Sequence, residues 1–92
     1  MSDQTAKFSL GQTVATSNAL KNIPNNEIFL ALSRHAQGDW GELDKEDWDS
    51  NERALKNGGR LFSRYVTSGK IPFWIITEWN RSVTTVLLPK DY

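Results

Sequence analysis

The chain has 92 residues, enough for one domain, and its eleven acidic and eleven basic side chains leave no formal net charge. A 38% share of hydrophobic residues is typical of a globular protein and too high for intrinsic disorder. The zero net charge argues against a general nucleic-acid coat, and the absence of cysteine excludes disulfides, thiolate zinc sites and cysteine nucleophiles. Since there is neither a signal peptide nor an apolar run of the ~18 residues that span a bilayer, we expect a cytoplasmic protein without membrane contact.

The N-terminal part predicts little regular structure. Residues 1–7 are polar and are expected to be disordered. Residues 8–16 predict a short strand in which Gly11 marks a bend or bulge, and Ser17 or Asn18 is expected to cap a helical turn that follows it.

Two helices are predicted next. The first runs from about residue 27 to 37 and ends before Gly38, which suits a left-handed position. Its apolar stripe consists of Ile28, Ala31, Leu32 and His35, flanked by Phe29 and Ala36. The second begins after Asp44 as N-cap and ends at Gly58 and Gly59. Its apolar content is thin, so it is expected on the surface with one edge docked.

After the glycines the hydrophobic period changes to two, which predicts three strands over residues 60–66, 71–79 and 82–88. The turns between them fall at residues 68–69 and 80–81. The predicted fold is therefore a single α+β domain of order β-α-α-β-β-β, residues 1–92, with an antiparallel sheet of three or four strands and two helices packed on one face.

The last two strands predict a sheet that is apolar on both sides. Pairing across the 80–81 turn sets Thr77 opposite Thr84 and Ile75 opposite Val86. The other face then carries Trp74, Ile76, Val83 and Leu87. We expect the helices to cover one face, and the N-terminal segment or a partner to cover the second.

One candidate site lies around the end of the first helix. Its candidate partner-binding residues are Arg34, His35, Asp39, Trp40 and Glu42. His35, the single histidine, has the chemistry of a general acid or base, although a packing role at the edge of the apolar stripe is favoured. Trp40 is either an exposed anchor or a side chain folded under its loop, and the second interpretation is again favoured.

A second candidate site would bind nucleic acid. It consists of Arg60, Arg64, Tyr65 and Lys70, because alternating basic and aromatic residues on a strand can grip phosphates and stack bases. The favoured alternative is the solvated face of an edge strand. No cofactor or metal is expected, and a metal-dependent hydrolase built on Asp39, Glu42 and His35 is the least favoured hypothesis. No residue is assigned a catalytic role.

Two blocks of the sequence carry a resemblance. They are Arg34-His35-x-x-Gly38-Asp39-Trp40-Gly41 followed by Asn51, Leu55 and Gly58, and Ile76-Thr77-Glu78 followed by Arg81-Ser82, Thr84-Thr85-x-Leu87-Leu88-Pro89 and Tyr92. With these blocks, residues 8–92 resemble the small bacterial proteins commonly labelled plasmid-related protein. The resemblance implies a single-domain bacterial cytoplasmic protein, often carried on plasmids or integrated elements, with no activity attached.

We therefore expect a non-enzymatic interaction or regulatory protein of a plasmid, phage or integrated element. It would bind, and in one version inhibit, a host defence or replication protein through Trp40 and the acidic surface of residues 39–52. The alternative is a small RNA-binding or RNA-cleaving toxin, because the order of elements resembles that of RelE-type toxins. Its residues would be Arg34, His35, Arg60, Arg64 and Tyr65. A homodimer is compatible with either hypothesis.

Overall fold

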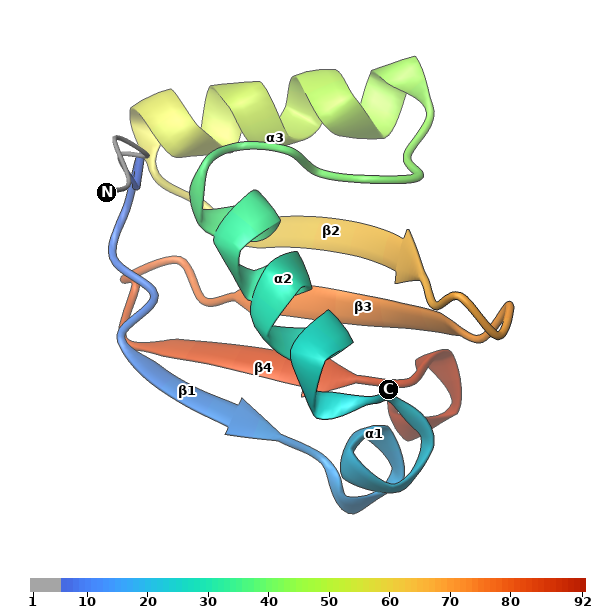
Figure 1. Cartoon of the computed structure of the whole chain (residues 1–92). Coiled ribbons are helices and arrows are strands. Elements are labelled where there is room, and N and C mark those ends of the chain that lie inside the picture. Colours follow the sequence, from blue (N-terminus) through green and yellow to red (C-terminus); the bar gives the residue numbers. More distant parts are fainter. Residues whose placement is uncertain (1–5) are drawn as a thin grey trace.

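The computed structural model describes residues 6–92, which form a four-stranded sheet with helices on one side and along one edge (Figure 1). The elements are β1 (Gln12–Ala15), α1 (Ser17–Asn22), α2 (Asn25–Ala36), α3 (Lys45–Asn57), β2 (Leu61–Val66), β3 (Pro72–Thr77), β4 (Val83–Leu87) and a 3-10 turn, η1 (Pro89–Asp91). Most of the segment expected to be disordered, residues 1–5, lies outside the described residues. Lys7 is held in place, because its backbone N–H donates to the Ala36 carbonyl at 2.8 Å.

The sheet has the strand order β1-β4-β3-β2. β2, β3 and β4 are antiparallel neighbours, as predicted, but β1 runs parallel to β4. The prediction of a purely antiparallel sheet is therefore wrong. Its error has a physical reason: turn patterns identify strands that are neighbours in sequence, whereas β1 reaches β4 only through a long crossover connection.

The predicted pairing of the last two strands is confirmed. Thr77 lies opposite Thr84, and Ile75 lies opposite Val86. Pro72 occupies the first position of β3, where the ladder hydrogen bond that proline cannot donate is dispensable. The local rules of strand and turn chemistry are enough to set this part of the fold.

The helix ends also follow local chemistry. The Asp44 side chain accepts the Asp47 N–H at 2.8 Å as the N-cap of α3, and Gly58 ends that helix with a φ of 89°. Gly38 follows α2 with a φ of 83°. The helical turn predicted after residues 8–16 is a third helix, α1, in addition to the two helices of the predicted fold. Its cap is the Thr16 side chain and not Ser17 or Asn18.

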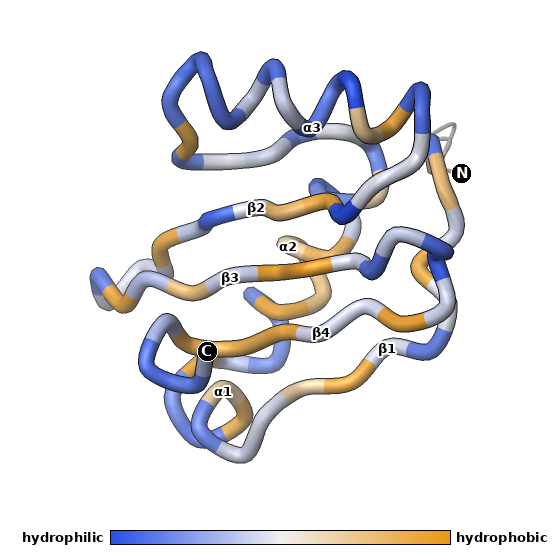
Figure 2. Tube along the Cα trace, turned by 180° about the vertical axis from the view of Figure 1, so that it is seen from behind, coloured by the Kyte–Doolittle hydropathy of each residue, from blue (hydrophilic) through white to orange (hydrophobic). Residues whose placement is uncertain are grey.

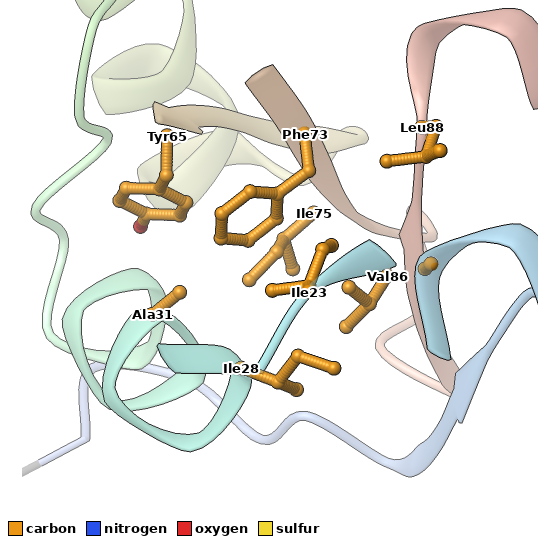
Figure 3. Packing of buried hydrophobic residues seen from close by; sticks show 9 residues of the cluster. Ile23, Ile28, Ala31, Tyr65, Phe73, Ile75, Val86 and Leu88 are labelled. Carbon is orange, nitrogen blue, oxygen red and sulfur yellow. The ribbon is translucent and has the colours of Figure 1, made fainter. Parts of the chain in front are cut away.

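α2 crosses one face of the sheet, and the main core lies between them (Figures 1 and 3). The core residues are Ala19, Ile23, Ile28, Ala31, Tyr65, Phe73, Ile75, Val86 and Leu88. In Figure 3, Tyr65, Phe73 and Ile75 point from the strands toward Ile28 and Ala31 of the helix. The apolar stripe predicted for α2 therefore faces the sheet, except that its predicted flank Phe29 is 72% exposed.

α3 does not share this face, which corrects the prediction of two helices packed on one side. It lies along the outer edge of β2 instead (Figure 1). The Asn51 amide, 4% exposed, donates to the Phe62 carbonyl at 2.6 Å and accepts the Phe62 N–H at 3.0 Å. One side chain of α3 thus replaces the hydrogen bonds of a neighbouring strand.

The second face of the sheet, which is turned toward the viewer in Figure 2, carries its own aromatic contacts. The Phe62 and Trp74 rings are 5.1 Å apart, and Tyr92, just after η1, packs on Trp74 at 5.7 Å between ring centroids. The N-terminal segment or a partner was expected to cover this face, but Phe8 of the N-terminal segment packs on the helix side, next to His35. In the described residues it is the C-terminal end that lies over the second face.

Candidate functional site

A chain of buried hydrogen bonds runs from α2 across the sheet. His35 Nδ1 lies 2.5 Å from Ser63 Oγ, His35 Nε2 lies 2.9 Å from Thr77 Oγ1, and Thr77 Oγ1 lies 2.7 Å from Thr84 Oγ1. The Thr84 hydroxyl donates to the Leu10 carbonyl at 2.6 Å. All four side chains are completely buried.

The hydrogen bond from Thr84 to the Leu10 carbonyl sets the direction of the hydrogen bonds that link Thr84, Thr77 and His35 Nε2. Since the hydroxyl of Thr84 donates to a carbonyl, its oxygen accepts the proton of Thr77, whose oxygen in turn accepts from His35 Nε2. Because burial lowers the pKa of His35 to about 3 and keeps the ring neutral, Nδ1 carries no proton and accepts that of Ser63. The imidazole is therefore a neutral Nε2–H tautomer with both nitrogens satisfied.

The surroundings of His35 keep it neutral. Burial, together with a smaller effect of the positive charge of Arg81, lowers its pKa from 6.5 to about 3. A serine hydroxyl beside an imidazole is the beginning of a nucleophilic site, but neither group reaches the surface. In this arrangement the histidine joins α2 to β2, β3 and β4 and serves packing, as the favoured interpretation predicts.

Trp40 is also completely buried. Its ring meets the His35 ring edge-on at 5.5 Å and stacks on Phe8 at 6.1 Å. Its indole N–H donates to Glu52 of α3 at 2.8 Å. The tryptophan closes one end of the core, so of the candidate partner-binding residues only Arg34, Asp39 and Glu42 reach the surface.

Arg34 and Asp39 form a bidentate ion pair, with Nε to Oδ2 at 2.7 Å and Nη2 to Oδ1 at 3.2 Å. Their side chains are 44% and 46% exposed. Hydrogen bonding within the pair lowers the pKa of Asp39 and raises that of Arg34. The guanidinium lies 4.7 Å above the ring of Tyr65, whose hydroxyl donates to the Asp39 carbonyl at 2.6 Å. The structure thus assembles one polar cluster on the surface.

A groove opens next to this cluster, between α2 and the end of β2. Its cavity has a volume of about 110 Å³. It is lined by Glu27, Leu30, Ala31, Arg34, Tyr65, Val66 and Phe73. Leu30 is 65% exposed and its neighbour Phe29 is 72% exposed, although both are large and apolar. We call the exposed side of α2 with this groove the α2 groove.

The sequence interpretation missed Leu30, which is central to the α2 groove. A helical wheel contained the signal: Leu30 lies on the opposite side of α2 from the stripe that includes Ile28 and His35. An apolar residue at such a position is not required by the core, and Phe29, the residue before it, is exposed as well.

The candidate nucleic-acid residues do not come together. Tyr65 points into the core, whereas Arg64, adjacent on β2, lies on the second face opposite Trp74. Arg60 donates to the Tyr92 hydroxyl at 2.8 Å on that same side. Lys70 lies in the turn before β3, with a φ of 71°. The aromatic neighbours of the two arginines are therefore Phe62, Trp74 and Tyr92.

Within residues 6–92, no three acidic or histidine side chains come together as possible ligands of one metal ion. In the same part of the chain, no helix has the length and apolar character needed to cross a membrane.

Comparison with known proteins gives one similarity. Clostripain from Hathewaya histolytica is 31% identical to this chain over 84 residues, a stretch that covers 91% of the chain but 15% of clostripain. The chain thus corresponds to a segment of that longer protein. No protein-family model matches the sequence. No solved structure matches it either.

Proposed function

We propose that this chain is a non-enzymatic interaction or regulatory protein that binds a protein partner through the α2 groove. The observation that carries the proposal is the exposure of two large apolar side chains on a helix whose opposite stripe already supplies the core: Leu30 lines the groove, and Phe29 lies about 100° further round the helix. Burying each of them in a complex would contribute about 1.5–3 kcal/mol. Adjacent apolar side chains with a polar rim are typical of recognition surfaces.

The groove is also held in shape before any partner arrives. Its floor consists of Tyr65 and Phe73, which belong to the core. At one end, the Glu27 carboxylate accepts the Ser68 N–H at 2.9 Å and the Ser68 hydroxyl at 2.8 Å. At the other end, Arg34 is fixed by Asp39. A preorganised site loses little conformational entropy on binding.

The partner that fits is a protein segment that inserts an apolar side chain between two charged rims. The acidic stretch first considered for this role has a local explanation, because Asp44 and Asp47 form the cap of α3. The resemblance to plasmid-related proteins suggests the setting of a mobile element, so a host defence or replication protein is the class of partner we propose.

The test is affinity purification of the full chain from its native host, with bound proteins identified by mass spectrometry. Leu30→Glu should reduce recovery of the specific partner at least about tenfold, because it places a charge on the apolar surface. Its folding stability should change by no more than about 0.5 kcal/mol, since the side chain is exposed. Lys56→Glu is the matched control, on the exposed side of α3. Equal recovery with Leu30→Glu would contradict the proposal.

One observation favours a second candidate, RNA binding. Arg60 and Arg64 share the second face with Phe62, Trp74 and Tyr92, and Tyr92 is 73% exposed. Aromatic rings stack bases and arginines hold phosphates. Binding to single-stranded RNA that weakens steeply with salt and is lost in Arg64→Ala would support this candidate over the α2 groove.

A further inference from the structure

The two outer edges of the sheet, on β2 and on β1, differ in whether other parts of the chain hydrogen-bond to them. The outer edge of β2 is closed: besides Asn51, the Arg64 N–H donates to the Trp40 carbonyl at 3.1 Å, and the Arg64 carbonyl accepts the Glu42 N–H at 2.6 Å. The outer edge of β1 is open, and in both views no other element of the described chain lies beside it (Figures 1 and 2). Closed edges prevent strand addition and open edges permit it.

The hydrogen bonds of β1 to β4 show which groups face outward. The Gln12 N–H donates to the Ser82 carbonyl at 2.9 Å, and the Thr16 N–H donates to the Val86 carbonyl at 3.0 Å. Because backbone groups alternate along a strand, the N–H and C=O groups of Thr13 and Ala15 point away from β4. Residues 11–16 contain no proline and no charged side chain, the devices that commonly protect an edge.

We propose that β1 pairs with β1 of a second copy of this chain, antiparallel, about a twofold axis at Val14. Thr13 of each copy then lies opposite Ala15 of the other copy. Each of these two pairs exchanges two backbone hydrogen bonds, which gives about four between the copies. Val14, 38% exposed, meets its own equivalent on the second face of the sheet. Such a β-branched pair adds to the strand pairing.

A second copy suits this edge better than an unrelated strand for two reasons. The outward pattern is self-complementary, because Thr13 and Ala15 flank Val14 symmetrically and the uncharged segment brings no like charges together at the axis. In addition, the closed edge of β2 stops growth after two copies, so that the assembly is a closed dimer and not a fibre. The sheets of the two copies then form one continuous sheet across the dimer.

The oligomeric state of the full chain tests the proposal. Sedimentation velocity from about 5 µM to about 500 µM should show a dimer that forms with rising concentration. Thr13→Pro removes an outward N–H and no hydrogen bond to β4, so it should yield a folded monomer over the whole range. Thr13→Val keeps the N–H and the β-branched shape, and it should dimerise like the native chain.

A second pair of variants guards against misfolding of the proline variant. Val14→Lys places two positive charges at the axis and should shift the dissociation constant at least about tenfold, whereas Val14→Thr should leave it within about threefold. A native chain that stays monomeric throughout overturns the proposal. A dimer that persists in both Thr13→Pro and Val14→Lys also overturns it. The same holds for a chain that stays monomeric and binds only a strand of another protein at the edge of β1.

Discussion

The two sides of α2 differ in which kind of side chain is buried and which is exposed, although the residues concerned are close in sequence. His35 faces inward, completely buried, with both ring nitrogens hydrogen-bonded. Arg34 faces outward beside exposed Leu30, and its charge is met by Asp39. The inner side holds a polar residue in an apolar setting, and the outer side holds apolar residues in water.

The contrast teaches which side the fold needs. A buried polar chain contributes little while it is complete but costs much when one member is lost, because the remaining groups are desolvated without partners. Exposed apolar side chains contribute almost nothing to stability, so the fold does not require an apolar side chain at Leu30 in the α2 groove. Three substitutions or conditions would break or sharpen this comparison.

The largest effect is expected from His35→Ala. It leaves a cavity and removes the partner of both Ser63 and Thr77, so the free energy of unfolding should fall by about 3 kcal/mol or more. Arg34→Ala, one residue away, should cost no more than about 1 kcal/mol. Urea denaturation measures both. If the two variants were equally stable, the inner side would not be the one that the fold needs.

The next effect concerns pH. The pKa of His35 is lowered from 6.5 in the unfolded chain to about 3 in the folded one, so the unfolded state binds more protons below pH 6.5. The stability that His35 contributes is complete above that pH and is lost as the pH falls toward 3, with a slope of up to about 1.4 kcal/mol per pH unit.

Urea denaturation at a series of pH values between about pH 7 and pH 5 checks this slope. That window lies above the usual pKa of Asp39, whose lowered value affects stability only in more acidic solution. His35→Gln lacks the titrating ring and should show a flat profile there. A native profile as flat as that of the variant would mean that the imidazole is accessible to protons in the folded chain.

The smallest effect is expected from Asp39→Asn. It removes the charge that holds Arg34 and raises the pKa of that guanidinium, but the pair is about half exposed. The free energy of unfolding should therefore fall by less than about 1 kcal/mol, and less still in high salt. Thermal unfolding at two salt concentrations measures it. A loss as large as that of His35→Ala would remove the distinction between the two sides.

Much of the local structure was predictable. The N-cap Asp44, the end of α3 at Gly58 and the pairing of Thr77 with Thr84 all depend on residues that are close in sequence. The burial of Trp40 and His35 was the favoured interpretation because lone aromatic and histidine side chains usually pack. The exposure of Leu30 was readable from the helical period but was not used.

What the sequence by itself determined is the set of helices and strands and the hairpin of β3 and β4, since hydrophobic period, caps and turns act within a few residues. Only the tertiary structure decided that β1 lies parallel to β4, that Asn51 closes the edge of β2, and that Ser63, Thr77 and Thr84 complete the hydrogen bonds of His35. These contacts join segments far apart in the chain, and no local rule states which distant donor will meet which acceptor once the core is packed.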